Sequence, residues 1–157
     1  MARKLIILLA VTVLLIVGCQ KKAEVDIAAE KAAVAAVLQN YVLAVVDEDM
    51  ERYARYVSHD TGMVNFGAFG DPIVGWDGLE QVMNGQDEAL SDTKIDVTDI
   101  RVTVTPSGDW AWATSLWKLR AVMGENPIEL PIRCTWVLEK KPTGWVIVHF
   151  HKSTPAG

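Results

Sequence analysis

From Lys94 to its end, the chain consists of strand-like segments joined by short turns that contain glycine or proline. Each segment alternates apolar and polar side chains, as a strand with one covered face does. Turns this short connect antiparallel neighbours, because parallel strands need a crossover of a dozen or more residues. The sequence therefore predicts one antiparallel sheet with strands at 94–105, 110–121, 128–140 and 144–155.

The closing segment, 144–155, carries the densest β-signal of the chain, with Val, Ile, Phe and Trp in close succession. Strict alternation would divide its side chains into two faces. One face would be wholly apolar core, and the other would be half apolar and half imidazole. The predicted core face holds Val146, Val148 and Phe150, and the opposite face holds Trp145, Ile147, His149 and His151.

The segment before the sheet shows helical periodicity and strong capping residues. Asp26 precedes a helix predicted over 27–46, and Asp49 precedes a short helix over 50–57. Two short strands follow at 63–66 and 73–76, and Asp77-Gly78-Leu79-Glu80 reads as a capping box that opens a third helix ending near Leu90. In the strand after it, the apolar parity changes near Thr98-Asp99, which indicates a β-bulge and a bent sheet. The fold class is therefore α+β, a strongly bent antiparallel sheet wrapped over three N-terminal helices.

The first residues have the features of an export signal. Arg3 and Lys4 precede an apolar run at 5–17, which is shorter than the ~20 residues of a membrane-spanning helix. The run ends in Ile16-Val17-Gly18-Cys19, which resembles the lipobox of bacterial lipoproteins. That resemblance implies cleavage after residue 18 and lipidation of Cys19; the alternative is an uncleaved N-terminal anchor. In both cases we expect an extracytoplasmic, membrane-anchored domain, in the outer membrane facing the periplasm if the source is a diderm bacterium, because Gln20 rather than Asp follows Cys19.

The remaining chain divides into a short tether, 19–26, and one domain, 27–155. Without Arg3 and Lys4 it has 13 basic against 20 acidic residues, a net charge of −7. Such a charge argues against nucleic acid as a partner. Lipidation of Cys19 would leave Cys134 as the one free thiol, on an apolar strand face where a buried, unreactive side chain is expected.

Several segments resemble the SnoaL-like branch of the nuclear transport factor 2-like superfamily: 57–60, 64–67, 74–76 and, above all, 144–153 followed by Pro155. The closing segment is also similar to the end of the calcium/calmodulin-dependent kinase II association domain. The resemblance implies a cone-shaped α+β barrel with an inner cavity and a tendency to form a homodimer through the sheet. It implies neither a cofactor nor a single catalytic set. Where the association domain has pocket arginines, this chain has Thr114 or Ser115 and Trp136.

The candidate site residues follow from this expected cavity. The two histidines of the closing strand lie about 6.6 Å apart along it, so they could bind or orient a ligand, or be hydrogen-bonded structural groups. A zinc site would need a third ligand such as His59 or Asp60, and no metal is expected. Asn65 could donate a hydrogen bond to a ligand or satisfy the backbone at a strand end. The six tryptophans could line the cavity or a dimer contact. The ligand-binding candidates are Asn65, Phe66, Trp112, Trp136, His149 and His151.

These residues favour a membrane-anchored module that binds a small apolar or aromatic molecule, or that acts as a dimeric accessory domain. The alternative is a small isomerase, cyclase or hydrolase in which His149 or His151 is the general base and Asn65 donates to a developing oxyanion. A third possibility is a purely structural oligomerisation module. No catalytic residue is assigned.

Overall fold

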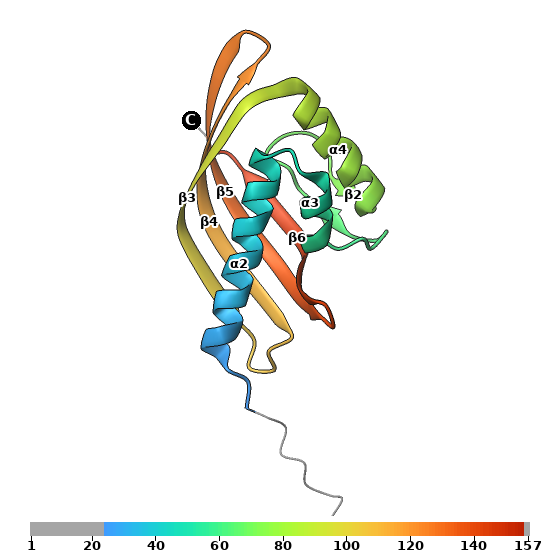
Figure 1. Ribbon diagram of the computed structural model, residues 1–157, viewed down its shortest axis with the longest axis vertical. Helices are drawn as coiled ribbons and strands as arrows, with labels where there is room; N and C mark the ends of the chain where they lie inside the picture. Colours follow the sequence, from blue (N-terminus) through green and yellow to red (C-terminus); the bar gives the residue numbers. More distant parts are fainter. Residues whose placement is uncertain (1–23, 156–157) are drawn as a thin grey trace, which may run out of the picture.

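A computed structural model describes residues 24–155, and the expected export signal and lipidation site lie outside this range. Three helices lie on the concave side of a bent sheet of four long antiparallel strands (Figure 1). The elements are α2 (Ile27–Val46), α3 (Met50–Tyr56), β1 (Val64–Asn65), β2 (Ile73–Val74), α4 (Gly75–Ala89), β3 (Leu90–Val104), β4 (Trp110–Met123), β5 (Asn126–Lys141) and β6 (Gly144–Ser153).

The first two helices begin where their capping residues predict. The side chain of Asp26 accepts a hydrogen bond from the Ala29 amide, and Asp49 accepts one from the Arg52 amide. By length and composition α2 could cross a membrane. It is instead a core helix of this domain, with Val34 fully buried against the sheet.

The third helix begins earlier than the capping box predicted. α4 starts at Gly75, and it has no side-chain cap, so the expectation that Asp77 caps it was wrong. Gly75 adopts φ +70°, and its amide donates to the Met63 carbonyl at 2.7 Å. A Cβ at this position would lie 3.0 Å from the Thr61 carbonyl oxygen. Both the positive φ and the close approach of Thr61 therefore favour glycine here. This tertiary contact turns the chain directly from β2 into the helix.

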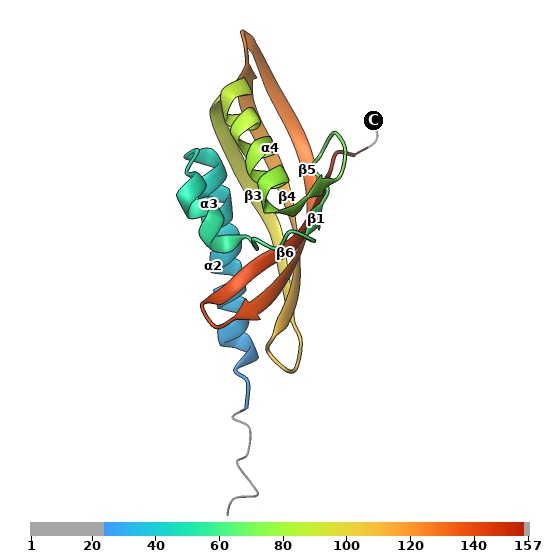
Figure 2. The same cartoon turned by 90° about the vertical axis from the view of Figure 1, so that its right-hand side faces the viewer.

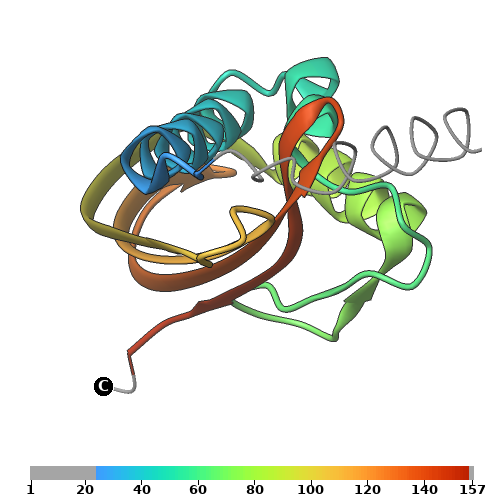
Figure 3. The ribbon, with the colours of Figure 1, turned by 90° about the horizontal axis from the view of Figure 1, so that it is seen from below.

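The sheet has the order β3-β4-β5-β6, and it curves around α2 without closing into a barrel within the described residues (Figure 3). The predicted bulge is confirmed by a register shift between Thr98 and Arg101, where Asp99 has φ 55°. A second shift lies between Ser91 and Lys94, near the start of β3. Seen from the side, the long strands bend over the helices and leave their other face outward (Figure 2).

β6 contains a bulge that the sequence analysis missed. Ile147 pairs with Leu138 and His149 pairs with Val137, so Val148 is an extra residue in β6. The bulge changes which side chains face inward. The buried residues have odd numbers before the bulge and even numbers after it. The predicted faces were therefore wrong. Trp145 and Ile147 are buried, Val146 and Val148 are only partly covered, and Phe150 and Lys152 continue the inner face.

Candidate functional site

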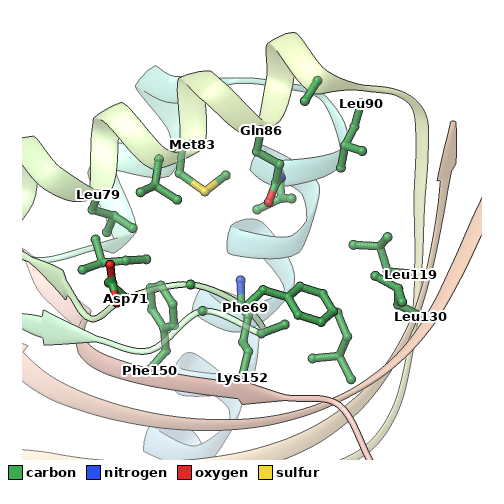
Figure 4. A pocket seen from close by; sticks show the side chains of 18 of the residues that line it. Phe69, Asp71, Leu79, Met83, Gln86, Leu90, Leu119, Leu130, Phe150 and Lys152 are labelled. Atoms are coloured by element: carbon green, nitrogen blue, oxygen red, sulfur yellow. The ribbon is translucent and has the colours of Figure 1, made fainter. Parts of the chain in front are cut away.

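A cavity of about 530 Å³ lies between α4, the 67–74 loop and the inner face of the sheet (Figure 4). Its walls are mostly apolar. α4 contributes side chains at helical spacing, and β4 and β5 contribute alternate residues, because each element turns one face inward. Phe69 and Asp71 stand exposed in the loop at its rim. The principal wall residues are Leu79, Met83, Gln86, Leu119, Leu130 and Phe150.

Lys152 is the charged group on the sheet side of this cavity, opposite the rim residue Asp71 in the loop, and its nitrogen points toward the space beneath α4 (Figure 4). Part of the side chain is open to the cavity, but the residue lies deep in the domain. No carboxylate within residues 24–155 forms an ion pair with it. Burial in these surroundings lowers the pKa of Lys152 to about 8, and only the nearby Cys134 opposes this shift.

Aromatic rings surround the Lys152 ammonium. Nζ lies 4.8 Å from the ring centroids of Trp117 and Phe150, and 5.1 Å from that of Tyr41. The ring of Trp136 is next, at 5.8 Å. Ring faces carry partial negative charge, so this cage stabilises a cation in place of a carboxylate.

Two buried tyrosines extend the polar contact away from the cavity. Lys152 Nζ donates to the Tyr41 hydroxyl at 3.0 Å, and that hydroxyl lies 3.0 Å from the hydroxyl of Tyr53. Burial raises the pKa of Tyr41 and that of Tyr53. Both phenols are therefore neutral hydrogen-bonding groups over the physiological pH range.

Four of the six predicted ligand-binding residues lie on the outer face of the sheet. His149 is hydrogen-bonded through Nδ1 to the Val64 carbonyl at 2.6 Å, and His151 is exposed. Phe66 meets both imidazoles edge-on, with ring centroids 5.8 and 5.6 Å away. Trp112 is exposed on the same face, in register with Val137 and His149. None of the four lines the cavity beneath α4.

The other two predicted residues are buried. Trp136 faces inward beside Lys152, and its indole nitrogen donates to Ser115 Oγ at 3.2 Å. Asn65 accepts a hydrogen bond from the Phe150 amide at 2.8 Å, so its side chain ties β1 to β6. Its amide nitrogen has no partner among the described residues, and the residue is not part of the cavity wall.

His59 and Asp60 have structural contacts. The His59 ring stacks on Trp76 at 3.9 Å, and Asp60 accepts a hydrogen bond from the Gly62 amide at 2.7 Å. In the described part of the chain, no group of three or more His, Cys, Asp or Glu residues has the arrangement of a metal site.

Sequence reasoning missed Lys152, although a signal was present. Lys152 has the same parity as Phe150, which the alternation pattern assigned to the core. A lysine on an apolar strand face is uncommon, since lysine is almost never buried without a partner. That exception indicated the site more directly than the two histidines did.

The comparisons with known proteins agree with this architecture. Residues 34–157 match the SnoaL-like domain family. No curated protein matches the chain. A nuclear transport factor 2-like superfamily protein from Salmonella enterica has a similar structure, with TM-score 0.75 and 21% identity over 83% of this chain and 94% of that one.

Two further structures are similar. A ketosteroid isomerase-like protein from Erwinia carotovora atroseptica has TM-score 0.67 and 22% identity, over 82% of this chain and 98% of that one. The CaMKII hub of S. rosetta has TM-score 0.65 and 25% identity, over 80% of this chain and 96% of that one. With a family match over most of its length and this fold, the chain belongs to the SnoaL-like domain family.

Proposed function

We propose that this domain binds a small, mostly apolar or aromatic molecule in the cavity beneath α4, with one oxygen of the ligand at Lys152. The observation that carries the proposal is an ammonium group at a mostly apolar cavity, with no carboxylate partner within residues 24–155. A buried charge without a partner is costly. A ligand oxygen would accept hydrogen bonds that Tyr41 alone does not use, because an ammonium has three donors.

The dimensions of the cavity fit this function. A volume of about 530 Å³ falls within the roughly 300–1,000 Å³ of small-molecule sites. Such sites have apolar walls and a few polar groups that fix orientation. Here Lys152 and Gln86 are polar groups among apolar walls.

The expected lipid anchor supplies the setting of the proposal. Lipidation at Cys19 would hold the domain, which begins at Ile27, close to the membrane on its extracytoplasmic side, in the periplasm if the source is a diderm bacterium. Apolar molecules concentrate in membranes. A domain anchored there would meet its ligand at high local concentration.

We also propose that the domain forms a homodimer through the outer face of its sheet. Trp110, Trp112 and Leu116 project from β4 on that face, each more than 40% exposed. An exposed apolar patch of this kind is typical of protein–protein contacts. The similarity to a CaMKII hub, an association domain, supports assembly as a second role.

Among the described residues, no histidine lines the cavity beneath α4. This speaks against the alternative of an isomerase, cyclase or hydrolase that uses a histidine as general base in that cavity. His149 and His151 face away from the concave side. The proposed function therefore rests on Lys152 and the apolar walls.

Calorimetric titration tests the proposal directly. The full chain in lipid nanodiscs is titrated with 2-acetonaphthone, an aromatic ketone, and empty nanodiscs correct for partitioning into lipid. Saturable binding is expected, and Leu130→Trp, which fills the cavity, should abolish it. Leu116→Trp makes the same change on the outer face and should leave the affinity within twofold. No saturable heat for any small aromatic molecule would refute the proposal.

A further inference from the structure

The surroundings of Lys152 carry an inference about what happens to a bound ligand. We propose that Lys152 is a Schiff-base lysine, whose amine condenses with the carbonyl carbon of a small apolar or aromatic aldehyde or ketone held in the cavity. The inference rests on the proposed function, because the carbonyl compound must first occupy the cavity. It adds a chemical class of ligand and a covalent step.

The first support is the position of the nitrogen. Lys152 Nζ points into a cavity whose walls would hold the apolar body of the ligand (Figure 4). The bulge at Val148 places Lys152 on the inner face, and Phe150 lies beside it on the same face. A carbonyl compound held in the cavity would therefore lie on the side to which Nζ points.

The second support is the availability of the neutral amine. Burial lowers the pKa of Lys152 to about 8. At pH 7 the amine is therefore neutral in about a tenth of the molecules, against roughly 0.04% for an ordinary lysine. The titratable groups facing it are Tyr41 from α2 and Cys134 from β5, with Tyr53 of α3 behind Tyr41. Asp71 stands at the cavity rim, and among the ion pairs of the described residues there is none between it and Lys152.

The third support separates a carbonyl ligand from a carboxylate ligand. The ring faces of Trp117, Phe150, Tyr41 and Trp136 surround Nζ. These faces repel an anion, so a carboxylate beside Nζ would lie in an unfavourable field. An iminium ion carries its positive charge at the same nitrogen as the ammonium. The cage that stabilises the ammonium therefore stabilises the product of condensation as well.

The reaction balances without any redox partner. The lone pair of the neutral amine forms a C–N bond while the C=O π bond breaks. A proton then moves from nitrogen to the former carbonyl oxygen, which becomes the hydroxyl of a carbinolamine. The carbinolamine then loses this hydroxyl as water after taking up one more proton, and the C=N bond forms. Overall, an ammonium and a carbonyl compound give an iminium and water. Tyr41, 3.0 Å from Nζ, is placed to pass the protons.

Reductive trapping tests the inference. The full chain in nanodiscs is incubated at pH 7 with 2-naphthaldehyde and sodium cyanoborohydride, and peptide mass spectrometry locates the reduced adduct. Lys152 is expected to be labelled at least about tenfold faster than the exposed lysines Lys94 and Lys118. Tyr41→Phe should slow labelling of Lys152 severalfold while leaving Lys118 unchanged. Lys152→Arg should abolish the fast site, because a guanidinium stays protonated.

The outcomes of matched ligands separate this inference from the proposed function. If 2-methylnaphthalene and 2-acetonaphthone bind saturably but Lys152 is labelled no faster than Lys118, the Schiff-base inference is overturned and the binding function stands. If 2-naphthoate binds more tightly than 2-methylnaphthalene and 2-acetonaphthone, and Lys152 is not labelled fast, the Schiff-base inference is overturned and the cavity is an anion site. If nothing binds and nothing is labelled, both proposals fail.

Discussion

Lys152 and Tyr41 join the last strand to the first helix across the core, with 3.0 Å between Nζ and the tyrosine hydroxyl. The hydroxyl of Tyr53 lies on the other side of Tyr41 at the same distance. One phenol therefore serves two buried polar groups, and both depend on it.

Tyr41→Phe is expected to destabilise the domain by roughly 1–3 kcal/mol, because it leaves Lys152 and the Tyr53 hydroxyl without a buried partner. Urea unfolding of the full chain measures this change. Tyr56→Phe is the matched control, since Tyr56 is partly buried and no hydrogen bond of its hydroxyl is seen in the described structure. We expect the control to change the free energy of unfolding by less than about 0.5 kcal/mol. Equal effects of the two changes would contradict the role given to Tyr41.

Lys152→Met should change how stability depends on pH. The pKa of Lys152 is about 8 in the folded state and about 10.4 in the unfolded chain. Between these values the unfolded state binds more protons, so the stability of the native protein rises with pH. The loss of stability caused by burying the protonated Lys152 is fully present below pH 8, and it disappears by about pH 10.4. The methionine variant should lack this gain, which is on the order of 2 kcal/mol between pH 7 and 10. Parallel pH profiles of the two proteins would exclude a buried ammonium at this position.

Thiol counting tests the lipid anchor and the state of Cys134 together. Cys134 is buried, and burial raises its pKa to about 11, so it should not react with a thiol reagent in the native protein. In denaturant, one thiol per chain is expected if Cys19 carries lipid, because its sulfur is then a thioether. Two reactive thiols in the denatured membrane-extracted protein would refute lipidation of Cys19. Fast labelling of the native protein would show instead that Cys134 is accessible.

Trp112→Lys should dissociate the proposed dimer, because it places a charge among the exposed apolar side chains of Trp110 and Leu116 on the outer face. Sedimentation of the full chain in nanodiscs or detergent measures the oligomeric state. Leu43→Lys is the control: Leu43 is similarly exposed, but it lies on α2, on the other side of the sheet. If the native chain is a monomer, or if both variants dissociate equally, the outer face is not the interface. Binding of 2-acetonaphthone by Trp112→Lys should remain within twofold of the native value.

The parts of the fold that the sequence predicted are those fixed by local chemistry. Asp26 and Asp49 cap helices through contacts three residues away, and alternation marks the strands wherever one face is covered. The bulge at Thr98-Asp99 was visible because apolar residues on both sides of it show the change of parity. α4 began early for a reason that no local pattern contains, the contact of Gly75 with Met63.

The candidate site was harder to predict for the same reason. Residues 145–148 are all apolar, so the sequence carries no parity signal where β6 has its bulge. The register of β6 against Val137 and Leu138 decides which side chains face inward. That register is a property of two strands together, and the alternation of one strand does not reveal it.

The extra residue in β6 also bears on how this domain could acquire new ligands. If the register of Ile147 with Leu138 continued unbroken, with Val148 opposite Val137 in place of the bulge, His149 would face Trp136 and His151 would face Cys134. The interior would then hold two imidazoles, and Lys152 would point to the outer face. Loss of the bulge, with Val148 kept and paired in register, could thus exchange an amine for a histidine pair on the inner face, with every other strand unchanged. Chains of this fold that have a bulge before their last Phe-X-Lys segment should therefore differ in chemistry from chains that lack it, more than their overall similarity suggests.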